Sequence, residues 1–132
     1  MASWNKYQPW VEYLVEGANI GSDSFAVALT DTAPTATHSL LSQITAISMT
    51  NLSSPAVTTT SSSQTGGTHD LVLQDLTLTA SDTVPQFQYV VLYDDTIAND
   101  PICGWWDYGS KVNMSAGETF LINFSAYTMR IA

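Results

Sequence analysis

The segment 87–109 constrains the fold more than any other, because it holds two apolar runs separated by a polar turn. Residues 87–93 are largely apolar at both odd and even positions, and they are rich in aromatic and β-branched side chains. Such a run is typical of a strand that is covered on both faces. Residues 94–101 are mostly short polar side chains before a proline, which indicates a loop. Residues 102–108 predict a second strand, so we expect a central hairpin on which the other strands pack.

The second strand of this hairpin carries two adjacent tryptophans, Trp105 and Trp106. Successive side chains of a strand point to opposite faces, so at most one indole belongs to any one surface. We expect the other to enter the core, which is the usual place for a large aromatic side chain in mid-strand. Gly104 leaves room for a ring to lie flat against the backbone. The core residues expected here and in the strand at 119–125 are Phe87, Tyr89, Val91, Tyr93, Trp106, Phe120, Ile122 and Phe124.

Short strands recur along the rest of the chain, with turn-forming residues between them. The clearest is 24–30, where Phe25, Val27 and Leu29 alternate with smaller side chains. Further short strands are predicted at 44–47, 112–114, 119–125 and 127–131. About seven to nine short strands at regular spacing predict an all-β fold, a β-sandwich or jelly roll.

Two features in the middle of the chain bear on how the strands are arranged. Residues 57–63 lie in a stretch of Ser, Thr and small side chains, which favours an edge strand; the alternative is a flexible arm that contacts a partner. The two glycines at 66–67 predict a hairpin turn. In the run 69–80 the leucines change face near Gln74. That change indicates a bulge or a strand that passes from one sheet to another.

Residues 1–20 hold the one helix that the sequence predicts, ahead of a single β domain at 21–132. Apolar residues recur at helical spacing in 4–16, with a proline suited to a first turn and a glycine just past the end. A helix this short is marginal alone, so it must dock on its own sandwich or on a neighbouring subunit. We expect this short helix or arm to bind a partner, through Trp4, Tyr7, Trp10, Val11 and Leu14.

Charge and composition exclude several kinds of partner. The 132 residues carry three Lys and Arg against twelve Asp and Glu, a formal charge of −9. We therefore expect neither nucleic acid nor an anionic membrane as a partner, because phosphate binding needs a cationic surface. The sequence has no apolar run of membrane-spanning length and no signal-peptide pattern at its start. Cys103 is the single cysteine, so we expect no intrachain disulfide.

Candidate chemical sites in the sequence are weak. An oxygen cage for calcium is one hypothesis, formed by Asp94, Asp95, Asn99, Asp100 and Asp107. The spacing does not match the helix–loop–helix calcium loop, and the same residue types form ordinary turns. A sugar platform at either tryptophan of the central hairpin is another hypothesis. The two histidines lack zinc-site spacing, and no nucleophile elbow is present. We therefore expect no enzyme activity, no cofactor and no metal.

Five short segments, read together, carry a resemblance to known proteins. They are Asn-Lys-Tyr at 5–7, Leu-Thr-Asp-Thr-Ala-Pro at 29–34, Tyr-Val-Val-Leu-Tyr-Asp-Asp-Thr at 89–96, Asn-Asp-Pro-Ile-Cys-Gly-Trp-Trp-Asp-Tyr-Gly at 99–109 and Ser-Ala-Gly-Glu-Thr-Phe at 115–120. Together they resemble a family of small virion proteins from tailed bacteriophages. The resemblance runs over most of the chain, and its specificity comes from the tryptophan pair and its flanks.

This resemblance implies a non-enzymatic capsid cement or decoration protein. Its expected partners are the major capsid protein and further copies of itself, as a homodimer or homotrimer that stabilises the head. The expected location is the outer surface of the virion, after assembly in the bacterial cytoplasm. The alternatives are a tail or head-fibre component, or a carbohydrate-binding β-sandwich module that contacts host-surface glycans.

Overall fold

The central hairpin predicted from the sequence is present in the computed structural model, which describes residues 3–132. Its strands pair antiparallel within one five-stranded sheet of order β1-β8-β7-β2-β3. The strands of this sheet are β1 (Trp4–Lys6), β2 (Phe25–Thr30), β3 (Ala56–Val57), β7 (Val84–Asp94) and β8 (Ile102–Met114). All six residues of β2 are buried, so this strand is covered on both faces instead of alternating between core and solvent.

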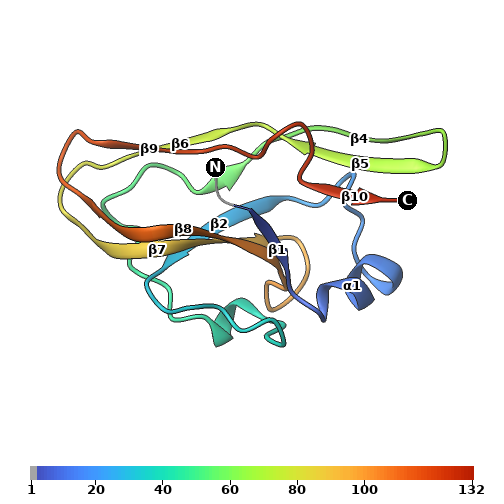
Figure 1. Ribbon diagram of the computed structural model, residues 1–132, viewed down its shortest axis with the longest axis horizontal. Helices are drawn as coiled ribbons and strands as arrows, with labels where there is room; N and C mark the ends of the chain where they lie inside the picture. The colour runs from blue at the N-terminus through green and yellow to red at the C-terminus, as the bar shows by residue number, and fades with distance from the viewer. Residues whose placement is uncertain (1–2) are drawn as a thin grey trace.

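A second layer of strands lies over this sheet (Figure 1). It consists of a three-stranded sheet of order β10-β5-β4 and a two-stranded sheet of β6 and β9. The strands of this layer are β4 (Thr59–Thr65), β5 (Thr68–Leu73), β6 (Leu76–Thr79), β9 (Thr119–Ile122) and β10 (Met129–Ile131). The two layers form the all-β sandwich that the sequence predicts.

The pairing of the last six strands is nested along the chain. β5 pairs with β10, β6 with β9, and β7 with β8, all antiparallel. These pairs form one long ribbon that folds over between the two layers of the sandwich. β5 ends at Leu73 and β6 begins at Leu76, in a different sheet. The predicted passage of this strand between sheets is therefore confirmed.

The Ser/Thr-rich stretch forms edge strands, as predicted, although in two pieces. β3 ends the five-stranded sheet, and β4 ends the three-stranded sheet. Gly66 and Gly67 have φ values of 60° and 87° and make the β4–β5 turn. The prediction of a strand at 44–47 is wrong, because this segment follows a 3-10 turn (Leu41–Gln43) and makes only an isolated bridge from Ala46 to Thr30. Its isoleucines pack against the core instead of extending a ladder.

Most of the predicted core residues lie in the interior. Phe87, Val91, Trp106, Ile122 and Phe124 are buried. Tyr93 and Phe120 are half-buried and pack against the core. Tyr89 is half-buried and lies outside the core cluster, because its strand position is opposite the exposed Asp107.

Candidate docking surface

The N-terminal segment is part of the sandwich and not a separate arm. β1 pairs with β8, and helix α1 (Trp10–Glu16) follows it at one end of the molecule (Figure 1). The side chains of Tyr7 and Trp10 are 0% and 1% exposed. The expectation that these two bind a partner is therefore wrong, because both rings fill the protein's own core. Of the segment expected at 1–20, residues 1 and 2 lie outside the described part of the chain.

The adjacent tryptophans of β8 point to opposite faces, as predicted. The Trp106 ring packs at a tilt against Trp4, with 4.8 Å between ring centroids, and edge-to-face against Phe124 at 5.4 Å. Trp105 packs on Tyr7, with 4.6 Å between centroids. The Trp4 indole lies directly over Gly104, which confirms the predicted close approach of a ring. The two neighbouring indoles therefore form no shared platform for a sugar.

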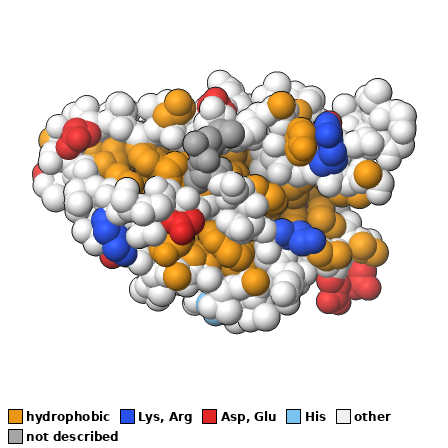
Figure 2. Space-filling model, in the orientation of Figure 1, with side chains coloured by type: hydrophobic (Ala, Val, Ile, Leu, Met, Phe, Trp, Pro, Cys, Tyr) orange, Lys and Arg blue, Asp and Glu red, His pale blue; other side chains and the backbone are white. Residues whose placement is uncertain are grey.

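A groove lies between the edge strands of the two layers, β1 and β10, with α1 at one end. Its volume is about 250 Å³, and its lining is Trp4, Lys6, Trp10, Leu14, Tyr127, Thr128, Met129, Arg130 and Ile131. Lys6 and Arg130 are two of the three cations in the whole sequence. Figure 2 shows blue side chains on both sides of an orange hollow in this region. We call it the β1–β10 groove; it is apolar with a basic rim in an otherwise acidic chain.

The two cations of the groove are held differently. Arg130 donates from Nε to Asp70 Oδ1 at 2.7 Å and from Nη2 to Asp70 Oδ2 at 2.9 Å, and it lies 3.9 Å from the Tyr127 ring centre. These hydrogen bonds lower the pKa of Asp70. The side chain of Lys6 has no hydrogen bond or ion pair within residues 3–132. Lys6 is therefore the cation that an incoming carboxylate can pair with.

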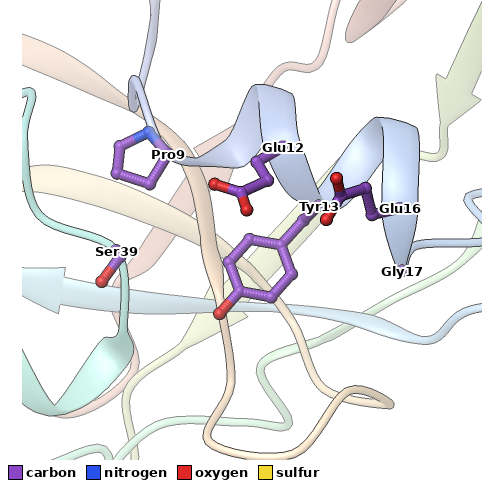
Figure 3. A pocket seen from close by; sticks show the side chains of 6 residues that line it. All are labelled: Pro9, Glu12, Tyr13, Glu16, Gly17 and Ser39. Atoms are coloured by element: carbon purple, nitrogen blue, oxygen red, sulfur yellow. The ribbon is translucent and has the colours of Figure 1, made fainter.

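The opposite flank of α1 is acidic. A pocket of about 490 Å³ is lined there by Pro9, Glu12, Tyr13, Glu16, Gly17 and Ser39. Figure 3 shows the two carboxylates side by side on the helix, above the Tyr13 ring. Like charges four residues apart on a helix repel, and Glu16 also lies in the last turn, where the helix dipole disfavours an anion. We call this region the acidic pocket.

An apolar ridge separates the acidic pocket from the groove. Val11 and Val15 are 43% and 80% exposed. At about 100° per residue they lie between Leu14, which faces the groove, and the two glutamates. Val11 and Leu14 remain accessible at this ridge, in agreement with their predicted role, whereas Val15 was not expected. The contribution of β10 to the groove was not expected from the sequence either. The one sequence signal for this groove is the presence of cations at positions 6 and 130.

The acidic loop after β7 does not assemble the calcium cage. Within residues 3–132 no three acidic, histidine or cysteine side chains converge on a common point. Asp107 instead accepts hydrogen bonds from Gln88 Nε2 and the Gly109 amide. Asp94 is buried, and its Oδ1 accepts from the amides of Thr96 and Ile97. Burial, followed by the hydrogen bond with Asp23, raises the pKa of Asp94 from 3.8 to about 7.

We expect this buried carboxyl to make the fold less stable in alkaline solution. A folded-state pKa above the unfolded value means that the folded chain holds its proton more tightly, so this stabilisation is complete below pH 3.8 and is lost as the pH rises through about 7. The Asp94→Asn variant keeps a neutral, hydrogen-bonding side chain. At pH 8 it should exceed the parent protein in free energy of unfolding by about 2 to 4 kcal/mol, and at pH 4 the two should be similar.

Urea unfolding at a series of pH values measures this difference. The matched control is Asp107→Asn, since hydrogen bonds lower the pKa of that exposed carboxyl. The control should keep the decline in stability between pH 4 and pH 8. A decline that persists unchanged in Asp94→Asn would rule out Asp94 as its source.

No protein-family model, curated protein or solved structure matches this chain. In the part of the chain that the structure describes, no helix is long and apolar enough to span a bilayer. The β1–β10 groove, the apolar ridge and the acidic pocket adjoin one another around α1, and together we call them the docking surface.

Proposed function

We propose that this protein is a non-enzymatic structural protein of a tailed bacteriophage virion, and that it decorates the outer surface of the head. Its partners in this proposal are the major capsid protein and further copies of itself. The location is supported by the sequence resemblance of the tryptophan-pair segment and its flanks. The acidic balance of the chain suits an outer surface, away from packaged DNA.

The observation that carries a docking function is the clustering of exposed apolar side chains at one end of the sandwich. Five large apolar side chains are exposed in residues 3–132, and four of them belong to α1 or to residues 127–131. These four are Val11, Val15, Tyr127 and Ile131. Contiguous apolar surface with a charged rim marks sites of protein–protein contact.

Co-sedimentation with phage particles tests this proposal. Purified protein is mixed with heads and, separately, with tails of the phage whose genome encodes it, and each mixture is pelleted. We expect the protein to pellet with heads in a saturable manner and to stay in solution with tails. Association with tails alone would contradict the location on the head, and binding to neither would contradict the virion role.

A pair of surface variants tests whether the docking surface is used. Val15→Asp places a charge on the apolar ridge and should reduce head binding at least tenfold, because it separates copies of the protein that attach to the head together. Leu121→Asp is the matched control, because Leu121 is 55% exposed on β9, toward the opposite end of the molecule from α1 (Figure 1). The control should bind as the parent protein does. Equal binding by both variants would mean that the docking surface does not contribute to attachment.

A further inference from the structure

Three strips of different character lie side by side across the docking surface. The acidic pocket contributes Glu12 and Glu16, the apolar ridge contributes Val11 and Val15, and the β1–β10 groove contributes Lys6, which has no partner among residues 3–132. Figure 2 shows this order at the α1 end of the molecule, with red, orange and blue side chains in succession. The surface therefore runs from negative through apolar to positive over the width of one helix and the adjoining groove.

Such an order is complementary to itself under a two-fold rotation. A two-fold axis that lies in the plane of contact and runs along the ridge leaves the ridge opposite its own copy. The same rotation places the acidic strip of each copy over the basic strip of the other. An isologous interface requires this property, because the same patch must serve both subunits.

Charge selects a second copy over other occupants of this surface. A uniformly acidic partner would be attracted by Lys6 but repelled by Glu12 and Glu16. A uniformly basic partner would be attracted by the two glutamates but repelled by Lys6. A second copy presents both charges in the required order. It also covers Val15, relieves the repulsion between the glutamates and gives Lys6 a carboxylate, so each feature that is unfavourable in the single chain is improved in the pair.

We infer that the docking surface joins two copies of this chain in an isologous dimer. The ridges of Val11 and Val15 meet at the axis, and Glu16 of each copy pairs with Lys6 of the other. This inference rests on the proposed function only in its self-association, and it concerns the isolated protein in the absence of any virion component.

Sedimentation velocity of the purified chain at micromolar concentrations tests the dimer. We expect a dimer for the parent protein and for Leu121→Asp, and a monomer for Val15→Asp. A monomer at all concentrations up to about 100 µM, or a trimer, would overturn the isologous dimer. A dimer that survives Val15→Asp would overturn this surface as its interface. Head binding is measured separately, so failure of the dimer is distinguishable from failure of the virion role.

Charge reversal tests the pairing itself. Lys6→Glu and Glu16→Lys should each weaken the dimer, raising its Kd about tenfold or more, because each places like charges face to face at both ends of the interface. An equimolar mixture of the two variants restores an opposite-charge pair at both ends. The mixture should therefore form a heterodimer with a Kd within about threefold of the parent value. If the mixture stays as weak as the separate variants, Lys6 and Glu16 do not face one another.

Discussion

Replacing Trp10 with alanine is expected to lower the free energy of unfolding by about 3 to 5 kcal/mol, the range for loss of a buried tryptophan or phenylalanine. Trp10 is 1% exposed and is among the largest fully buried side chains in residues 3–132. Its Nε1 donates to Met129 Sδ at 3.3 Å, so the ring ties α1 to β10 across the end of the sandwich. The substitution leaves a cavity and removes that contact at once. Urea unfolding followed by circular dichroism gives the difference directly.

The neighbouring residue supplies the control for this experiment. Val11 lies on the same helix but is 43% exposed in the single chain, so Val11→Ala, compared at a concentration at which both proteins are monomeric, should change the free energy of unfolding by less than about 0.5 kcal/mol. A Trp10→Ala variant as stable as Val11→Ala would mean that α1 is not packed on the sandwich.

The same reasoning applies to removal of residues 1–16, which takes away β1, Tyr7 and Trp10 together. That truncation should leave no folded sandwich, as expected for a segment that docks on its own sandwich and not on a neighbouring subunit.

The sequence predicted those parts of the fold whose signals are local. The apolar run before Asp94 and the tryptophan pair after it specify the central hairpin without reference to other strands. The change of face near Gln74 marks the passage of β5 into β6, because the side-chain period of a strand is fixed at two. Adjacent glycines specify the β4–β5 turn. Each of these features requires only a few consecutive residues, and each is present in the structure.

Prediction of the docking surface requires information that a local sequence pattern does not contain. Helical spacing shows that Trp10 and Leu14 share one face of a helix, but it does not show whether that face meets the chain's own core or a partner. β1 has three residues, too few for a strand pattern, and its position follows from pairing with β8. The groove joins Lys6 to Arg130, which are at opposite ends of the chain. Tertiary pairing alone brings them together.

The burial of Asp94 also follows from tertiary pairing of strands that are distant in the sequence. Short polar residues after a strand predict a turn, and Asp94 does accept two backbone hydrogen bonds within that turn. Its contact with Asp23 joins the start of β2 to the end of β7, where the register pairs Phe25 with Asp94. The proximity of these two carboxyls, which raises the pKa of Asp94, is therefore a property of the sheet and not of the loop sequence.

Gly104→Ala is expected to displace β1 and to lower the free energy of unfolding by about 3 kcal/mol, the upper part of the range for overpacking. A Cβ atom at this position would lie 2.5 Å from the Asn5 carbonyl oxygen and would overlap the Trp4 indole. The carbonyl belongs to the backbone of β1 and cannot rotate away, so the whole strand must move. That movement uncovers Trp106 and shifts Lys6 at the rim of the groove. Chemical unfolding, with tryptophan fluorescence to follow the exposure of the indoles, measures both effects.

Gly17→Ala is the matched control for this variant. A Cβ atom there would lie 3.9 Å from its nearest neighbours in Tyr13, which is ordinary van der Waals contact. The control should remain within about 0.5 kcal/mol of the parent protein. Because β1 carries Lys6, Gly104→Ala should also weaken the dimer. A Gly104→Ala protein with unchanged stability would mean that β1 is not seated against β8, and the groove between β1 and β10 would then lose one of its two walls.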